Sequence, residues 1–171
     1  MRELSGQLKK GTGDGGRGKG KPDPATLFEG AGPLVERLRA ESPFISGAAM
    51  VARARQILAE LGAGEQIAVI NAHPRIGERA ERVRAQSAHS FREQGYDRDE
   101  TPPEVFARLA HLNDEYEQKF GFRFVVFVNG RSKAAIVPVL EARLRGSRAE
   151  ELQTALADIV AIAEDRLRQE P

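Results

Sequence analysis

Hydrophobic side chains recur at the three- and four-residue spacing of an amphipathic helix along most of the chain after residue 23. The stretch that begins near residue 147 illustrates the pattern, because its apolar positions fall on one helical face at about 100° per residue. These positions are Leu152, Leu156, Ile159, Ile162 and Ala163. The pattern predicts an all-α fold, a single-domain helical bundle over residues 24–168.

Residues that start or stop helices set the predicted boundaries. Short helical stretches lie on either side of Gly30–Gly32, and serines at positions 46 and 132 predict helices over 47–61 and 133–145. Capping boxes that begin at Thr101 and Ser147 predict helices over 102–120 and from 148 to about 168. An apolar helix over 65–72 ends at His73-Pro74, because proline disfavours helix in the residue before it.

One segment departs from the helical pattern. Residues 122–128 read Phe-Arg-Phe-Val-Val-Phe-Val and precede Asn129-Gly130, which indicates a strand and a turn. Because the chain offers no second convincing strand, we expect a lone extended segment near 122–128. Its backbone groups then need other hydrogen-bond partners, and a bound ligand is one candidate.

Composition and charge exclude several classes of protein. The 171 residues suit one domain, and 26 basic against 25 acidic residues are too balanced for a dedicated nucleic-acid binder. The absence of cysteine excludes a disulfide framework, an iron–sulfur centre and a cysteine nucleophile. The three histidines have no known metal-ligand spacing, so we expect no metal. With no membrane-length apolar run and no signal peptide, we expect no membrane partner and a cytoplasmic location.

Residues 1–22 form a Gly/Lys-rich segment that we expect to be a disordered tail, because it contains too few apolar residues to order itself. The segment carries six basic and two acidic residues, a charge of +4. It is either a basic arm for nucleic acid or membrane, or a solvated tail. The lack of interleaved aromatic residues favours the solvated tail and no nucleic-acid partner.

Two polar residues fall on predicted apolar faces. Arg166 lies within the apolar arc of the last helix, whereas Arg168 lies on the opposite side. A buried guanidinium requires an anionic partner, either an internal carboxylate or the carboxylate of a substrate. Asn113 lies on the inner face of the helix over 102–120, where the simpler interpretation is a hydrogen bond to loop backbone.

Two further sites offer groups for acid–base chemistry. His73 follows a helix and precedes a proline, so local rigidity holds it, and histidine titrates near neutrality. A structural role is the alternative. The run Ser90-Phe-Arg-Glu93-Gln94 is either a capping box or a hydroxyl, a carboxylate and an amide within one turn that bind a nitrogen-rich small molecule. We expect His89 and His111 to be exposed and outside any site.

Taken in order, these residues resemble one family, the 2-oxo-4-hydroxy-4-carboxy-5-ureidoimidazoline (OHCU) decarboxylases of urate breakdown. The resemblance covers about residues 24–168. The segments that carry it are Leu27-Phe28-Glu29, Ser42-Pro43-Phe44, His73-Pro74, Ser90-x-x-Glu93-Gln94, Leu112-Asn113-x-x-Tyr116-x-x-Lys119-Phe120-Gly121-Phe122-x-Phe124-Val125 and Arg166-Leu167.

The resemblance implies a helical homodimer that converts OHCU to (S)-allantoin without a cofactor. By the matching positions, His73 is the catalytic acid–base residue, and Glu93 assists and orients it or binds the ureido group of the substrate. Arg166 meets a carboxylate or carbonyl of the substrate. The remaining substrate-binding positions are Pro74, Ser90, Gln94 and the backbone of Phe124, Val125, Val126, Phe127 and Val128.

The chain also departs from the family. Arg75-Ile76-Gly77 follows His-Pro where many members carry Asp-Leu, which adds a positive charge and puts fine substrate specificity in doubt. The front of the chain looks short, and we expect the usual first helix of the family to be missing. Two alternatives are a non-catalytic helical interaction module of the same fold and an acid–base enzyme for another ureide or hydantoin. The interaction module predicts no pocket around His73 and a Glu93 that serves only as a cap.

Overall fold

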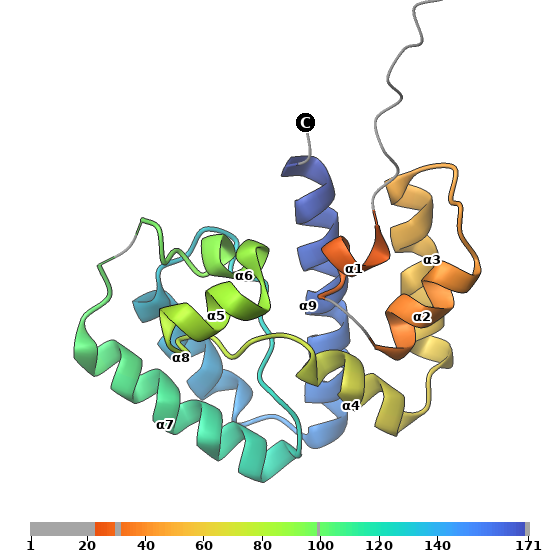
Figure 1. Cartoon of the computed structure of the whole chain (residues 1–171). Helices are drawn as coiled ribbons and strands as arrows, with labels where there is room; N and C mark the ends of the chain where they lie inside the picture. Colours follow the sequence, from red (N-terminus) through yellow and green to blue (C-terminus); the bar gives the residue numbers. More distant parts are fainter. Residues whose placement is uncertain (1–22, 30–31, 99, 170–171) are drawn as a thin grey trace, which may run out of the picture.

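A computed structural model of the chain describes residues 23–29, 32–98 and 100–169. Within these ranges it contains nine helices and no strand, which confirms the predicted all-α fold (Figure 1). The predicted tail, residues 1–22, lies outside the described ranges. The helices are α1 (Pro24–Leu27), α2 (Pro33–Ala40), α3 (Gly47–Glu60), α4 (Ala63–Asn71), α5 (Ala80–Gln86), α6 (Ala88–Glu93), α7 (Pro103–Phe120), α8 (Lys133–Arg143) and α9 (Arg148–Gln169).

Helix α9 lies at the centre of the bundle. Helices α1 to α4 lie on one side of it and α5 to α8 on the other (Figure 1). It packs against α1, α3, α4 and α7. Side chains from both sides join one hydrophobic core, in which Ile57, Ile70, Leu109 and Ile159 are fully buried. None of the described helices combines the length and apolarity needed to cross a membrane.

Several predicted caps are confirmed. The Ser46 hydroxyl accepts a hydrogen bond from the Ala49 amide (3.0 Å) and starts α3, and Ser132 starts α8 in the same way. Ser147 and Glu150 form the reciprocal capping box of α9. Gly121 ends α7 in the left-handed conformation, at φ 79°, which a residue without Cβ adopts at little cost.

Three local predictions are wrong. Thr101 does not cap α7, because Pro102 occupies the N-cap position and the buried Thr101 hydroxyl has no hydrogen-bond partner within the described ranges. The predicted end of the helix over 47–61 is one residue late, because Leu61 is the C-cap of α3. The next residue, Gly62, is already the N-cap of α4, at φ −66°, and Glu65 accepts a hydrogen bond from its amide. Helix α5 was not predicted, because its seven residues bury only Val83 and so carry almost no apolar periodicity.

The expected extended segment is present. Residues 123–128 adopt no regular secondary structure, and side chains hold the backbone along this segment. Arg143 donates to the Val125 carbonyl oxygen (2.7 Å), and Arg131 donates to those of Phe127 (2.6 Å) and Val128 (2.9 Å). Neither the amide nor the carbonyl of Val126 forms a hydrogen bond with another described residue. The segment therefore keeps unpaired backbone groups, as its sequence indicated.

Candidate active site

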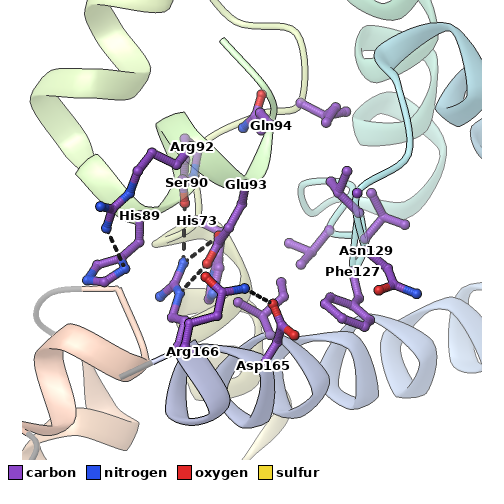
Figure 2. Close-up of a pocket in the computed structure, with 18 of the residues that line it drawn as sticks. His73, His89, Ser90, Arg92, Glu93, Gln94, Phe127, Asn129, Asp165 and Arg166 are labelled. Atoms are coloured by element: carbon purple, nitrogen blue, oxygen red, sulfur yellow. Dashed lines mark hydrogen bonds and ion pairs between the residues drawn. The ribbon is translucent and has the colours of Figure 1, made fainter. Parts of the chain in front are cut away.

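A cavity of about 630 Å³ opens where α6, the extended segment and the carboxyl-terminal half of α9 meet (Figure 2). Every residue that the sequence predicts for the site lines it: His73, Pro74, Ser90, Glu93, Gln94, Phe124, Val125, Val126, Phe127, Val128 and Arg166. These residues are separated by up to 93 positions in the chain (166 − 73) and come from four parts of the fold. The pocket that the interaction-module alternative excludes is present.

His73 is buried at the end of α4, with 4% of its surface exposed. Its Nδ1 lies 3.3 Å from the Val69 carbonyl oxygen, and because a carbonyl only accepts, Nδ1 carries the hydrogen. Nε2 is then the unprotonated nitrogen, and it has no hydrogen-bond partner among the described residues. The orienting contact therefore comes from the Val69 backbone. Glu93, for which orienting the ring was one of two expected roles, forms no hydrogen bond with it.

Burial sets the charge of His73. Desolvation has the largest effect and lowers the pKa of the imidazole. Glu29 raises this pKa, Arg166 lowers it, and the Val69 hydrogen bond and Glu93 raise it by smaller amounts. The net pKa lies below the ordinary value of 6.5, so the ring is neutral at pH 7 rather than titrating near neutrality. A neutral imidazole with a bare Nε2 is equipped to accept a proton.

Arg166 forms an internal ion pair. An internal carboxylate was one of the two partners expected for it, and the carboxylate of a substrate was the other. Its Nε and Nη2 donate to the two carboxylate oxygens of Glu93 (2.6 and 2.8 Å), and Nη2 also donates to Glu29. Nη1 donates to the carbonyl oxygens of Leu27 (3.0 Å) and Thr26 (3.3 Å). Only 2% of the Arg166 side chain is exposed, and these partners compensate for the burial of its charge.

The Ser90–Glu93 capping box is wrong, because Ser87 caps α6 by accepting from the Ser90 amide (3.0 Å). Ser90 instead lies inside α6 and donates from its hydroxyl to Glu29 (2.6 Å). The hydroxyl, the carboxylate and the amide of the Ser90–Gln94 run all reach the cavity lining, as the binding-site interpretation requires. Each also has a partner within the protein.

The side chain of Gln94 holds the turn that follows His73-Pro74. Its Nε2 donates to the Arg75 carbonyl (3.1 Å) and its Oε1 accepts from the Gly77 amide (3.0 Å). Asn113 donates to the Ile76 carbonyl (3.0 Å), which confirms the expected hydrogen bond to loop backbone. Two buried amides thus fix the turn that places Pro74 and Ile76 in the cavity wall.

Arg75 does not bring its charge into the cavity. Its guanidinium donates to Glu117 (2.7 and 2.6 Å) and to Asp114 (2.9 Å) on α7, and the residue is absent from the cavity lining. The departure from the family at this position therefore anchors the turn to α7. It leaves the charge of the pocket unchanged.

Two residues were misjudged from sequence. His89, expected to be exposed, is half-buried and lines the cavity, with its Nδ1 3.4 Å from Arg92 Nη2 (Figure 2). The sequence assigns Glu29 no role beyond its place in the family resemblance, yet it is the deeply buried partner of Arg166. The signal that could have found it is the buried arginine itself, which requires a carboxylate. His111 is exposed, as expected.

Within residues 23–29, 32–98 and 100–169, no group of three histidine or carboxylate side chains is arranged to hold a metal ion. Burial raises the pKa of the Glu29 carboxyl, but Arg166 and the Ser90 hydroxyl outweigh it and keep that pKa below its ordinary value. The cavity lining around His73 thus includes the Glu93 carboxylate and the Arg166 guanidinium beside a neutral imidazole, and Glu29 lies behind them on Arg166.

Comparison with known proteins assigns the family. The profile of the OHCU decarboxylase family matches residues 25–168. The chain belongs to this family. A 2-oxo-4-hydroxy-4-carboxy-5-ureidoimidazoline decarboxylase of Halalkalicoccus jeotgali is 32% identical over 143 residues, which are 84% of this chain and 80% of that relative. The family name and this relative confirm the predicted enzyme class, a carboxy-lyase.

Two further proteins extend the comparison. The uric acid degradation bifunctional protein of Bacillus subtilis is 32% identical over 143 residues, 83% of this chain but 28% of that protein. A crystal structure of an OHCU decarboxylase in the presence of (S)-allantoin superposes with a TM-score of 0.69 at 23% identity, covering 86% of this chain and 96% of that one. This likeness supports the helical fold.

Proposed function

We propose that this protein decarboxylates OHCU to (S)-allantoin in urate breakdown, with the cavity beside His73 as its active site. The observation that carries the proposal is the bare Nε2 of a buried, neutral histidine on the wall of a cavity, in a chain of the OHCU decarboxylase family. We expect the reaction to need no cofactor, because the ring of the substrate can accept the electrons that decarboxylation releases.

The reaction has two stages that the pocket must organise, the loss of CO₂ and then a proton shift from the hydroxyl to carbon 5. In OHCU, the carboxylate and a hydroxyl share ring carbon 4, and carbon 5 carries the ureido group and a C=N bond. Loss of CO₂ sends the electron pair of the C–C bond into a C4=C5 bond, and the ring nitrogen takes up a proton from solvent. The hydroxyl then loses its proton as the C4 carbonyl forms, and carbon 5 gains a proton on one face.

We assign the last proton transfer to His73. Its neutral Nε2 accepts the hydroxyl proton, and the resulting imidazolium donates a proton to carbon 5. The nearby carboxylates of Glu29 and Glu93 favour the imidazolium, since each raises the pKa of His73. Delivery from a fixed ring on one wall of the cavity accounts for a single enantiomer.

The carboxylate of the substrate fits the edge of Arg166 that Glu93 occupies. Nε and Nη2 hold the two Glu93 oxygens side by side, which is the bidentate geometry that any carboxylate prefers. Glu93 is 22% exposed, so its side chain can turn away, and its carboxylate then accepts from the ureido N–H groups. We propose this exchange of carboxylates as the binding step.

The extended segment supplies the remaining polar contacts. The unpaired amide and carbonyl of Val126 offer one donor and one acceptor to the amide-like ring and ureido groups of OHCU. Phe124, Val125, Phe127 and Val128 form the wall around them, and Pro74, Ser90 and Gln94 complete the lining. The homodimer and the cytoplasmic location stay predictions; sedimentation of the purified protein tests the first.

Consumption of freshly generated OHCU tests the proposal. We expect the protein to accelerate it, and His73→Gln to lower kcat by about 10²- to 10⁴-fold while the helical circular dichroism is retained. The control is His111→Gln, which removes an exposed histidine and leaves the rate unchanged. A wild-type protein that does not consume OHCU, or a His73→Gln variant as fast as the control, contradicts the proposal.

A further inference from the structure

We infer that Glu29 is a positioning residue of this active site: it is the permanent counter-ion that keeps Arg166 in place when Glu93 turns to the substrate. The inference rests on the proposed function and concerns a residue to which the family resemblance gave no role. It follows from how differently the two carboxylates that share Arg166 are held.

Three of the described residues donate hydrogen bonds to the Oε1 atom of Glu29. Arg166 Nη2, the Ser90 hydroxyl (2.6 Å) and the Ser87 hydroxyl (3.1 Å) all donate to it. Only 3% of the side chain is exposed. Its backbone has a φ of 56°, a conformation that is uncommon for a residue with a Cβ. The side-chain bonds hold Glu29 in this conformation, so the carboxylate stays where the folded chain puts it.

Glu93 is held much more loosely. Among the residues that the structure describes, Arg166 alone donates hydrogen bonds to its carboxylate, and 22% of the side chain is exposed to the cavity side. If Glu93 leaves Arg166 for the substrate, Glu29 and the carbonyls of Leu27 and Thr26 still hold the guanidinium. Glu29 therefore links the chain after α1 to α6 and α9. This link is the same whether Glu93 or the carboxylate of the substrate binds Nε and Nη2 of Arg166.

The same placement couples Glu29 to the histidine. The charged groups that act on the His73 ring are Glu29, Arg166 and Glu93, and Arg123 donates to the His73 backbone carbonyl (2.9 Å). Among the two carboxylates, Glu29 has the larger favourable effect on the imidazolium. Removal of its charge therefore disfavours the protonated ring and leaves Arg166 with one anion fewer.

The test compares three variants. Glu29→Gln keeps the shape but removes the charge, Glu29→Asp keeps the charge on a shorter side chain, and Glu164→Gln is the control. Glu164 lies on α9 two residues before Arg166 and pairs with Arg55 outside the cavity (2.8 Å). The measurements are kcat and KM on OHCU across pH, the melting temperature, and an NMR titration of the His73 ring, assigned by its absence in His73→Gln.

We expect Glu29→Gln to lower kcat by about ten- to a hundredfold with KM within about threefold, since misplacement of a catalytic group acts mainly on the chemical step. Its His73 titration and the acid limb of its rate profile move to lower pH. In Glu29→Asp both stay near the wild-type pH, and Glu164→Gln matches the wild type throughout.

A Glu29→Gln variant with the wild-type kcat and the wild-type His73 titration overturns the inference. The NMR titration needs no turnover, so it keeps the two claims apart. If the wild type does not consume OHCU, the proposed function fails, and an unshifted His73 titration in Glu29→Gln then overturns the coupling by itself. If Glu29→Gln does not fold, the test is Glu29→Asp. A His73 ring that titrates in this variant at a pH different from the wild type overturns the coupling between Glu29 and His73.

Discussion

Replacement of Arg166 by methionine is the sharpest perturbation of this structure. Methionine fills a similar volume but donates no hydrogen bond, so Arg166→Met leaves the carboxylates of Glu29 and Glu93 without their cation. The carbonyl oxygens of Leu27 and Thr26 lose a donor as well. Glu93 can turn toward water, but Glu29 cannot, because only 3% of its side chain is exposed. The penalty therefore falls mainly on Glu29.

The magnitude follows from the burial of the pair. Removal of one partner of a buried ion pair costs about 3–5 kcal/mol, a large part of the roughly 5–15 kcal/mol that holds a typical domain folded. For a domain of this size, each kcal/mol lowers the melting temperature by about 2–4 °C, which gives a decrease of about 6–20 °C.

The penalty depends on pH in a defined direction. In the wild type, the pKa of Glu29 is lowered, so its ionised form stabilises the fold above the unfolded value of 4.5 and this stability is lost as pH falls through the folded pKa. In Arg166→Met the main lowering cause is gone, and burial raises the pKa of Glu29 above its unfolded value. Protonation then relieves the variant, so its deficit is smaller at pH 5 than at pH 7.

Urea unfolding at pH 7 and pH 5, followed by helical circular dichroism, measures these differences. The control is Arg168→Met on the same helix, which removes an exposed pair with Asp165 (3.0 Å) and changes stability by less than about 1 kcal/mol. Equal stabilities of the two variants at pH 7, or a deficit that grows at pH 5, refute the reasoning. If Arg166→Met does not fold, the double variant with Glu29→Gln is expected to recover helical structure.

Three further predictions concern the histidine and the turn after it. The kcat/KM for OHCU decreases as pH falls through a pKa below 6.5, because His73 must be neutral to accept a proton. A pH–rate profile in which kcat/KM already falls at a pH above 6.5 contradicts this prediction. Gly77→Ala lowers the free energy of unfolding by about 1–3 kcal/mol in thermal denaturation, since a Cβ at φ +74° would lie 2.9 Å from Leu109 Cδ1. Arg75→Met leaves the KM for OHCU within about threefold of the wild-type value, because Arg75 pairs with Glu117 outside the cavity. A tenfold change in KM would show that the charge of Arg75 acts on the substrate.

Local sequence signals predicted most of the fold. Apolar periodicity located the long helices α3, α7 and α9, and serine caps located the starts of α3, α8 and α9, because these signals depend on neighbours within one or two turns. The aromatic and β-branched run at 122–128 predicted the extended segment for the same reason. The polar face of α5 carried no such signal, and α5 was missed.

The partners within the site could not be read from local pattern. Arg166 was identified as misplaced on an apolar face, but its partner Glu29 lies 137 residues away, and no spacing rule connects them. Ser90 and Glu93 match the residue types of a capping box, but residue types alone do not show which serine starts the helix, and in the structure Ser87 caps α6. The lowered pKa of His73 depends on burial by several elements, which sequence does not report.

The most direct test of the account is circular dichroism of freshly generated OHCU with and without the protein. A proton delivered by His73 to one face of the ring gives (S)-allantoin alone, so we expect a rapid rise of its optical signal. His73→Gln slows this rise by about 10²- to 10⁴-fold, and His111→Gln preserves it. Slow formation of racemic allantoin in the presence of folded wild-type protein would contradict the account.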